Sequence, residues 1–168
     1  MSDRPEFALR AAHLGDAGRI FDMIRSHPDE LIPKPLGDIV ATIDRFLVAE
    51  VGGKIVGCAS YSILPEIGAA ERATVELQSV AVVASYRKFG IGRALIEALL
   101  GRVATFAPEE ALVLTFVPGF FERLGFREIP KSKVMHKLYS GCMHCTKHAD
   151  PFTCPEIAMS RKLRKDKE

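Results

Sequence analysis

The chain has little net charge and lacks a long apolar segment. Its formal net charge is +2 at pH 7, which does not favour nucleic acid or a membrane surface as a partner. No apolar run approaches the roughly 20 residues that span a bilayer. The N-terminal residues also lack the apolar stretch of a secretory signal. These absences predict a cytoplasmic protein with neither a nucleic-acid partner nor a membrane partner.

The chain is also poor in cysteine, with four in 168 residues, and it has no internal repeat or low-complexity linker. Three cysteines lie together near the C-terminus, so the pattern is one local feature of a cytosolic chain and not a disulfide scaffold. Hydrophobic residues make up 48% and charged residues 26%, which is ordinary for a globular protein. We therefore expect one domain that buries its own core.

Strand and helix patterns alternate along the chain, which predicts a single α/β domain. The glycine pair 52–53 predicts a hairpin, and the almost wholly apolar segment 111–116 predicts a central, buried strand. A connection is expected at 65–70. The expected strands are 7–10, 46–51, 54–63, 74–83, 111–116, 126–129 and 157–160.

Four helices are expected between these strands. The first follows Asp16 as N-cap and has Ile20, Phe21 and Ile24 as its apolar residues, and the second covers 38–46. A short helix opens at Pro118 and ends near Gly125. The longest reaches to about residue 106, and its apolar stripe consists of Ile91, Leu95, Leu99 and Val103.

The strongest chemical signal is the turn 87–92, which follows a valine-rich strand and opens the long helix. Backbone N–H groups at such a turn point to one place, and the helix dipole adds to them, so the turn favours an anion such as a diphosphate. Gly90 and Gly92 allow close approach, and Arg87 and Lys88 add positive charge. The alternative is a plain strand-to-helix turn in which glycine only relieves crowding.

Two motifs together resemble the GNAT superfamily of N-acetyltransferases. The R-x-x-G-x-G pattern of 87–92 resembles the acetyl-CoA signature of that family, and 120–126 resembles its F-[YF]-x-x-x-G-F block. The order of elements agrees over nearly the whole chain. A dinucleotide fold would need G-x-G-x-x-G with a later acidic residue, and a Walker loop would need G-K-[ST]; neither is present.

The resemblance implies a mixed central sheet that is splayed around an acetyl-CoA site and flanked by helices. It implies a GNAT domain at 1–161, which includes a Cys-rich loop at 142–154, and a basic tail at 162–168. Acetyl-CoA would be the acyl donor, with its pantetheine arm along the strand and its diphosphate on the turn. The cofactor-binding residues implied in this way are Val80, Val82, Arg87, Lys88, Phe89, Gly90, Ile91, Gly92, Phe120 and Phe121.

A finer resemblance, to the short N-acetylglutamate synthases, concerns the acceptor. It rests on segments 31–34, 111–121, 137–145 and 154–159. It implies acetylation of the amino group of L-glutamate, the first step of arginine biosynthesis, and thus a small-molecule amino-acid substrate. The chain departs from that pattern with Lys for Arg at 34, Pro for Ser at 35 and Tyr for Trp at 139, and with a longer spacing between the last two cysteines.

Lys34 and Thr115 are the candidate substrate-binding residues. Glutamate carries two carboxylates, and Lys34 lies in a proline-flanked loop where it would supply a cation. A solvated lysine and a packed core threonine are the respective alternatives. Another small amine or a protein N-terminus remains open as acceptor, as does a non-catalytic acetyl-CoA sensor. The sequence is compatible with a homodimer and does not fix the oligomeric state.

Glu76 is the candidate catalytic base. An acceptor ammonium must lose a proton before it attacks a thioester, and a carboxylate can take that proton directly or through water. In several members of the superfamily a glutamate at this position serves as base. Phe121 stands where many members carry a tyrosine that protonates the leaving thiolate, so that proton would come from water or from one of the tyrosines at 61, 86 and 139.

The Cys-rich loop has the spacing of a structural zinc site. Its candidate ligands are Cys142, Cys145, His148 and Cys154, with His144 as a second imidazole. Free thiols or a disulfide are the alternatives, and a zinc-stabilised interaction module is a further functional class. Cys58 lies apart on a strand, where we expect a small core residue.

Overall fold

The computed structural model describes residues 4–66, 68–135, 142 and 145–163. They form an α/β fold with one seven-stranded sheet in the order β1-β2-β3-β4-β5-β7-β6. The sheet is mixed, because β4 pairs in parallel with β5 while β1 with β2, β2 with β3, and β7 with both β5 and β6 are antiparallel. The predicted fold class is confirmed.

The chain divides into two compact units, of which the first comprises Met1–Tyr61 and Gln78–Arg102. Its two-residue hairpin at Gly52 and Gly53 has positive φ at both positions, as the predicted glycine pair requires. Its elements are β1 (Ala8–Ala11), α1 (Ala17–Arg25), α2 (Leu36–Ala41), β2 (Phe46–Val51), the first part of β3 (Lys54–Glu66), the end of β4 (Ala69–Val82) and most of α3 (Ile91–Val103).

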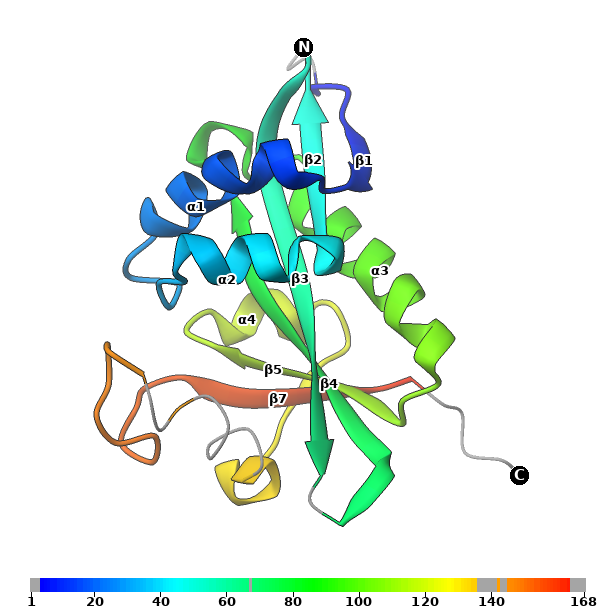
Figure 1. The fold of residues 1–168 in the computed structure, drawn as a ribbon, viewed down its shortest axis with the longest axis vertical. Helices are drawn as coiled ribbons and strands as arrows, with labels where there is room; N and C mark the ends of the chain where they lie inside the picture. The colour runs from blue at the N-terminus through cyan, green and yellow to red at the C-terminus, as the bar shows by residue number, and fades with distance from the viewer. Residues whose placement is uncertain (1–3, 67, 136–141, 143–144, 164–168) are drawn as a thin grey trace. The chain divides into compact units, whose positions relative to one another are not determined.

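Helices α1 and α2 cover one face of the strands in this unit (Figure 1). Their apolar side chains form one buried cluster with residues of β2, β3 and β4, including Phe46 and Cys58. Helix α3 packs on the opposite face, because a Cβ at Gly57 would meet Ile91 and Leu95 at 3.2 and 3.1 Å. The predicted stripe of α3 is confirmed, since Ile91, Leu95, Leu99 and Val103 are all buried.

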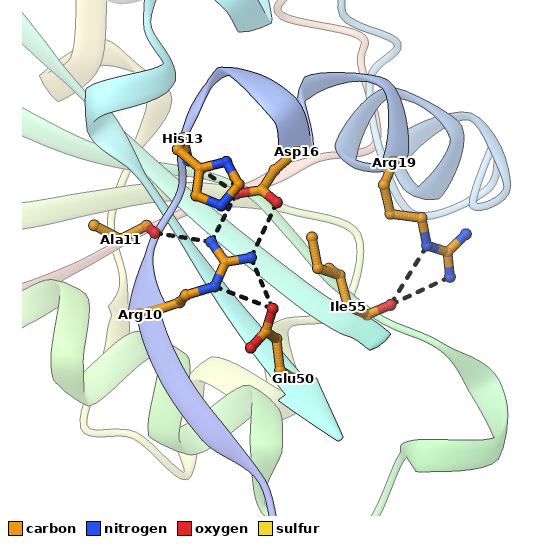
Figure 2. Close-up of polar contacts among 7 residues, drawn as sticks. All are labelled: Arg10, Ala11, His13, Asp16, Arg19, Glu50 and Ile55. Atoms are coloured by element: carbon orange, nitrogen blue, oxygen red, sulfur yellow. Dashed lines mark hydrogen bonds and ion pairs between the residues drawn. The ribbon is translucent and has the colours of Figure 1, made fainter. Parts of the chain in front are cut away.

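An ion-pair cluster fastens β1 to the start of α1 (Figure 2). Arg10 donates from Nη1 and Nη2 to the two carboxylate oxygens of Asp16 at 2.7 and 3.0 Å, and it also binds Glu50 at 2.7 Å. The Asp16 carboxylate accepts the backbone N–H of His13 at 2.8 Å. Hydrogen bonding from Arg10 is the main cause that lowers the pKa of Asp16 to about 2. Asp16 is thus the N-cap residue of α1, as predicted, but its carboxylate binds Arg10 and the His13 N–H and makes no side-chain cap hydrogen bond to the helix.

The second unit comprises Ser62–Leu77 and Val103–Glu168. Strand β7 lies between β5 and β6, and its ladder with β5 runs from Thr115 opposite Ile157 to Glu110 opposite Lys162. Leu64, Leu112, Val134 and Ala158 form its buried apolar cluster. Its further elements are β5 (Glu110–Thr115), α4 (Pro118–Glu122), β6 (Arg127–Glu128) and β7 (Ile157–Lys162).

Two predicted boundaries are wrong. The helix expected at 38–46 ends at Ala41, where the Thr42 hydroxyl donates to the Asp38 carbonyl at 2.7 Å, and Phe46 already begins β2. The connection expected at 65–70 belongs largely to strands, because β3 continues to Glu66 and β4 begins at Ala69. Within the described ranges, no helix has the length and apolarity to cross a membrane.

Candidate active site

The turn between β4 and α3 has the backbone shape of an anion site. Lys88 and Gly90 both have left-handed φ values, +72° and +84°, and such turns form the N–H-lined concavities that bind anions. The Ala94 N–H donates to the Gly90 carbonyl at 3.0 Å, so the turn leads directly into the first turn of α3. The Ile91 side chain is buried, so its contribution to an anion site is its backbone.

The Arg87 guanidinium already has an anionic partner at this turn. It forms a two-pronged ion pair with the Glu30 carboxylate, with N–O distances of 3.0 and 3.1 Å. Its Nε donates to the Val82 carbonyl at 3.2 Å. Both charged side chains are more than one-third exposed. A diphosphate at the turn would therefore compete with Glu30 for Arg87, a partner that the motif does not disclose.

Strand β4 is irregular just before its end. Ser79 has φ +53°, which is left-handed for a non-glycine residue. The thiol of Cys58 donates to the Ser79 carbonyl at 3.4 Å, and the Ser60 hydroxyl donates to the Gln78 carbonyl at 3.3 Å. Burial raises the pKa of the Cys58 thiol to about 12, against the smaller lowering effect of a backbone hydrogen bond involving Ala81. Cys58 thus stays protonated. It is buried in the core, as predicted, and its thiol also binds the irregular part of β4.

Lys34 is not a freely solvated lysine. Its Nζ donates to Gln78 Oε1 at 3.0 Å, and the ammonium lies 5.8 Å from the ring centroid of the buried Phe46. The α1–α2 loop therefore brings a cation to the β4 strand, at a residue two positions beyond Glu76. Sequence reasoning missed Gln78, because a glutamine in a strand carries no motif of its own.

Glu76 and Thr115 are two of the buried polar residues in the described part of the chain. Glu76 pairs in parallel register with Leu112, so the two side chains share a face of the sheet. Thr115 lies three positions beyond Leu112 on β5 and faces the other way. Its Oγ1 accepts the Val117 N–H at 2.9 Å, where the chain turns into α4. The structure does not bring Thr115 to the face of Glu76, and it gives the threonine oxygen a role in the turn.

The aromatic residues of the 120–126 block pack on one another. Phe121 is buried, and its ring meets those of Phe120 and Phe126 edge to face, with centroids 5.0 and 5.5 Å apart. Gly125 has φ +84°, as its predicted position at the end of the short helix requires. The contact of Phe120 and Phe121 with a cofactor stays a prediction.

The described part of the Cys-rich loop shows no side chains gathered around a metal position. Among the described residues, which include Cys142, Cys145, His148 and Cys154, no three His, Cys, Asp or Glu side chains are arranged to hold a metal ion. None of the four cysteines of the chain is in a disulfide. His148 packs on Phe116 with ring centroids 6.0 Å apart. His144 lies outside the described residues.

The Lys131 ammonium binds two backbone carbonyls of this loop. Lys131 Nζ donates to the carbonyls of Pro151 and Cys154 at 2.9 and 2.5 Å. Burial is the main cause that raises the pKa of the Cys154 thiol.

Comparison with known proteins identifies the family. The sequence model described as "Acetyltransferase (GNAT) domain" matches residues 42–128. An uncharacterised N-acetyltransferase of Chlorobaculum tepidum is 31% identical over 157 residues, which cover 92% of this chain and 96% of that protein. The chain therefore belongs to the GNAT acetyltransferases, and it is an N-acetyltransferase.

Two further relatives are similar over most of the chain. An amino-acid acetyltransferase of Mycobacterium tuberculosis is 29% identical over 147 residues, which cover 83% of this chain and 80% of that protein. A solved M. tuberculosis structure in complex with CoA and NLQ has a TM-score of 0.76 and 25% identity, and the match covers 94% of this chain and 99% of that one.

Proposed function

We propose that the protein transfers the acetyl group of acetyl-CoA to the amino group of a free amino acid, with L-glutamate as the acceptor. One observation carries the acceptor class: the Lys34 ammonium is held at 3.0 Å from Gln78 on β4. The name of the M. tuberculosis relative and the CoA in the similar structure support the same class of reaction. The reaction would be the first step of arginine biosynthesis.

The donor would lie along the end of β4 and on the turn that follows it. The diphosphate would lie on the turn 87–92, where the Arg87 N–H already donates to the Ala84 carbonyl at 3.2 Å and the backbone beyond it would supply the N–H groups. It would also take the charge of Lys88 and draw the Arg87 guanidinium from Glu30. The pantetheine arm would pair with the β4 backbone near Val80 and Val82, both half-buried. The left-handed residue Ser79 turns the backbone at the place where the thioester would need N–H donors.

Transfer would proceed by direct attack. The acceptor arrives as an ammonium, and Glu76 takes one proton from it, directly or through water. The neutral nitrogen then adds to the thioester carbonyl, the C–S bond breaks, and the CoA thiolate leaves. The nitrogen loses its second proton to water as the amide forms, and the released thiolate takes up a proton from water. A thiol has a pKa of about 8.5, so the thiolate leaves without a tyrosine to protonate it.

The acceptor's carboxylates would bind by charge at Lys34. A lysine offers a point charge that attracts a carboxylate. Its Nζ donates to Gln78 Oε1 at 3.0 Å, which holds the ammonium beside β4. This pair suits a carboxylate and offers nothing to an amine that lacks one.

A panel of acceptors tests the proposal, with thioester loss followed in the ultraviolet. It contains L-glutamate, L-glutamine, L-aspartate, glutamate α-amide and n-butylamine. We expect turnover to be highest with L-glutamate and lowest with n-butylamine. Lys34→Met should raise the KM for glutamate about tenfold or more, because a charged hydrogen bond is lost. The exposed Lys54, changed to Met, is the matched control.

Two outcomes would contradict the proposal. Equal turnover of n-butylamine and glutamate would show that no carboxylate is recognised. CoA binding without acetylation of any amine would indicate a sensor that only binds the cofactor.

A further inference from the structure

An arginine from the N-terminal segment lies on the phosphate turn, 85 residues away in sequence. Arg4 precedes β1, and its Nε and Nη2 donate to the Phe89 carbonyl at 3.1 and 2.9 Å. A Cβ at Gly90 would lie 2.9 Å from Arg4 Nη2. The guanidinium therefore lies directly against the left-handed glycine of the turn.

The charge of Arg4 is not compensated within the described part of the chain. No carboxylate there forms an ion pair with Arg4, whereas Arg87 is paired with Glu30. The Arg4 side chain is exposed. A guanidinium has five N–H donors, and the Phe89 carbonyl takes two of them, so three remain for another acceptor.

We propose that Arg4 is a phosphate-binding residue of the cofactor site, which places a second arginine at the turn beside the one in the R-x-x-G-x-G motif. The inference rests on the proposed binding of acetyl-CoA at residues 87–92. The Phe89 carbonyl holds one edge of the Arg4 guanidinium, and the remaining N–H donors of the guanidinium would bind phosphate oxygens. A fixed fork suits phosphate because two parallel N–H···O bonds form at once.

Ligand binding distinguishes a phosphate-binding Arg4 from an arginine that only anchors the N-terminus. An anchor would need the Phe89 carbonyl alone, and its loss would affect every ligand through stability. Loss of a phosphate-binding residue weakens the binding of CoA. It does not change the binding of pantetheine, which has the same arm but no diphosphate.

Calorimetry with CoA and with pantetheine tests the proposal on the full chain. Arg4→Gln should weaken CoA binding about tenfold, the effect of one charged hydrogen-bonding group, and leave pantetheine affinity as it is. Arg4→Lys should keep part of the affinity because the charge remains. Arg25→Gln is the matched control, because Arg25 lies over the Phe21 ring in α1. A melting curve of each variant shows that it is folded.

Four results would overturn the inference. Unchanged CoA affinity in folded Arg4→Gln would leave Arg4 as an anchor, and equal losses for CoA and pantetheine would mean the same. Tighter CoA binding would show that the guanidinium occupies the place of a phosphate. If the unaltered protein binds CoA no more tightly than pantetheine, the phosphate turn itself is misassigned, and the proposed function loses its cofactor site together with this inference. A preference for CoA over pantetheine that is equally large in the unaltered protein and in Arg4→Gln refutes the role of Arg4 alone.

Discussion

Replacing Asp16 with Asn should destabilise the protein at neutral pH and much less in acid. The carboxylate is largely buried, and its side chain is 7% exposed. Its pKa falls from the ordinary value of 3.8 to about 2, chiefly because Arg10 donates to it. A lowered folded-state pKa means that the ionised group stabilises the fold above pH 3.8 and loses this effect as the pH falls towards 2.

The size of the effect follows from that difference. It corresponds to about 2 kcal/mol of unfolding free energy at pH 7, of which about 1 kcal/mol remains at pH 3. Urea unfolding followed by circular dichroism measures it, since the chain has no tryptophan to report by fluorescence. The quantity to compare is the difference between the unaltered protein and Asp16→Asn at each pH.

Asp22→Asn is the control, because it removes an exposed carboxylate from α1, the helix that follows Asp16. It should change stability by less than about 0.5 kcal/mol at either pH. The reasoning fails if Asp16→Asn costs the same at pH 7 and pH 3, since the loss would then be one of packing and not of an ionised carboxylate. It also fails if the loss at pH 7 is no larger than that of the control.

Four further changes test the active site and the Cys-rich loop. Glu76→Gln should lower kcat by about 10² to 10⁴ at neutral pH, with partial recovery at high pH as the amine deprotonates, and a pH–rate profile like that of the unaltered protein would remove Glu76 from the mechanism. Gly90→Val should weaken CoA binding in calorimetry, because a β-branched residue is strained at φ +84° and would displace Arg4; unchanged affinity in a folded variant would contradict this. Lys131→Met should lower the melting temperature while kcat is retained, since two carbonyls lose their donor, and Cys145→Ser should lower it less. A larger loss in Cys145→Ser than in Lys131→Met would show that the thiols, and not Lys131, stabilise the loop.

The sequence predicted the parts of the fold that depend on local periodicity. The stripe of α3 repeats at helical spacing, so its four apolar residues had to lie on one side, and all are buried. The glycine pair at 52–53 adopts the left-handed conformation that a two-residue hairpin needs. The apolar segment at 111–116 became β5, paired on both sides.

The features that could not be predicted from the sequence depend on long-range contacts. Nothing near Ser79 in the sequence predicts a left-handed residue, because the donors that accompany it, Cys58 and Ser60, come from a different strand. The pairing of Glu30 with Arg87 spans 57 residues. The extension of β4 back to Ala69 likewise depends on its strand partner and not on its own pattern. The motif located the turn 87–92 in the sequence, but only the structure shows that Glu30 contacts it.

The position of β7 also bears on how the protein folds as it is synthesised. β5 and β6 are translated before β7, and each of them pairs with β7. Until Ile157–Lys162 emerge, both strands present an open edge, and open edges invite pairing with other chains. A nascent or prematurely terminated chain that stops before Ile157 would therefore keep its first unit complete in sequence while exposing β5 as a site for aggregation.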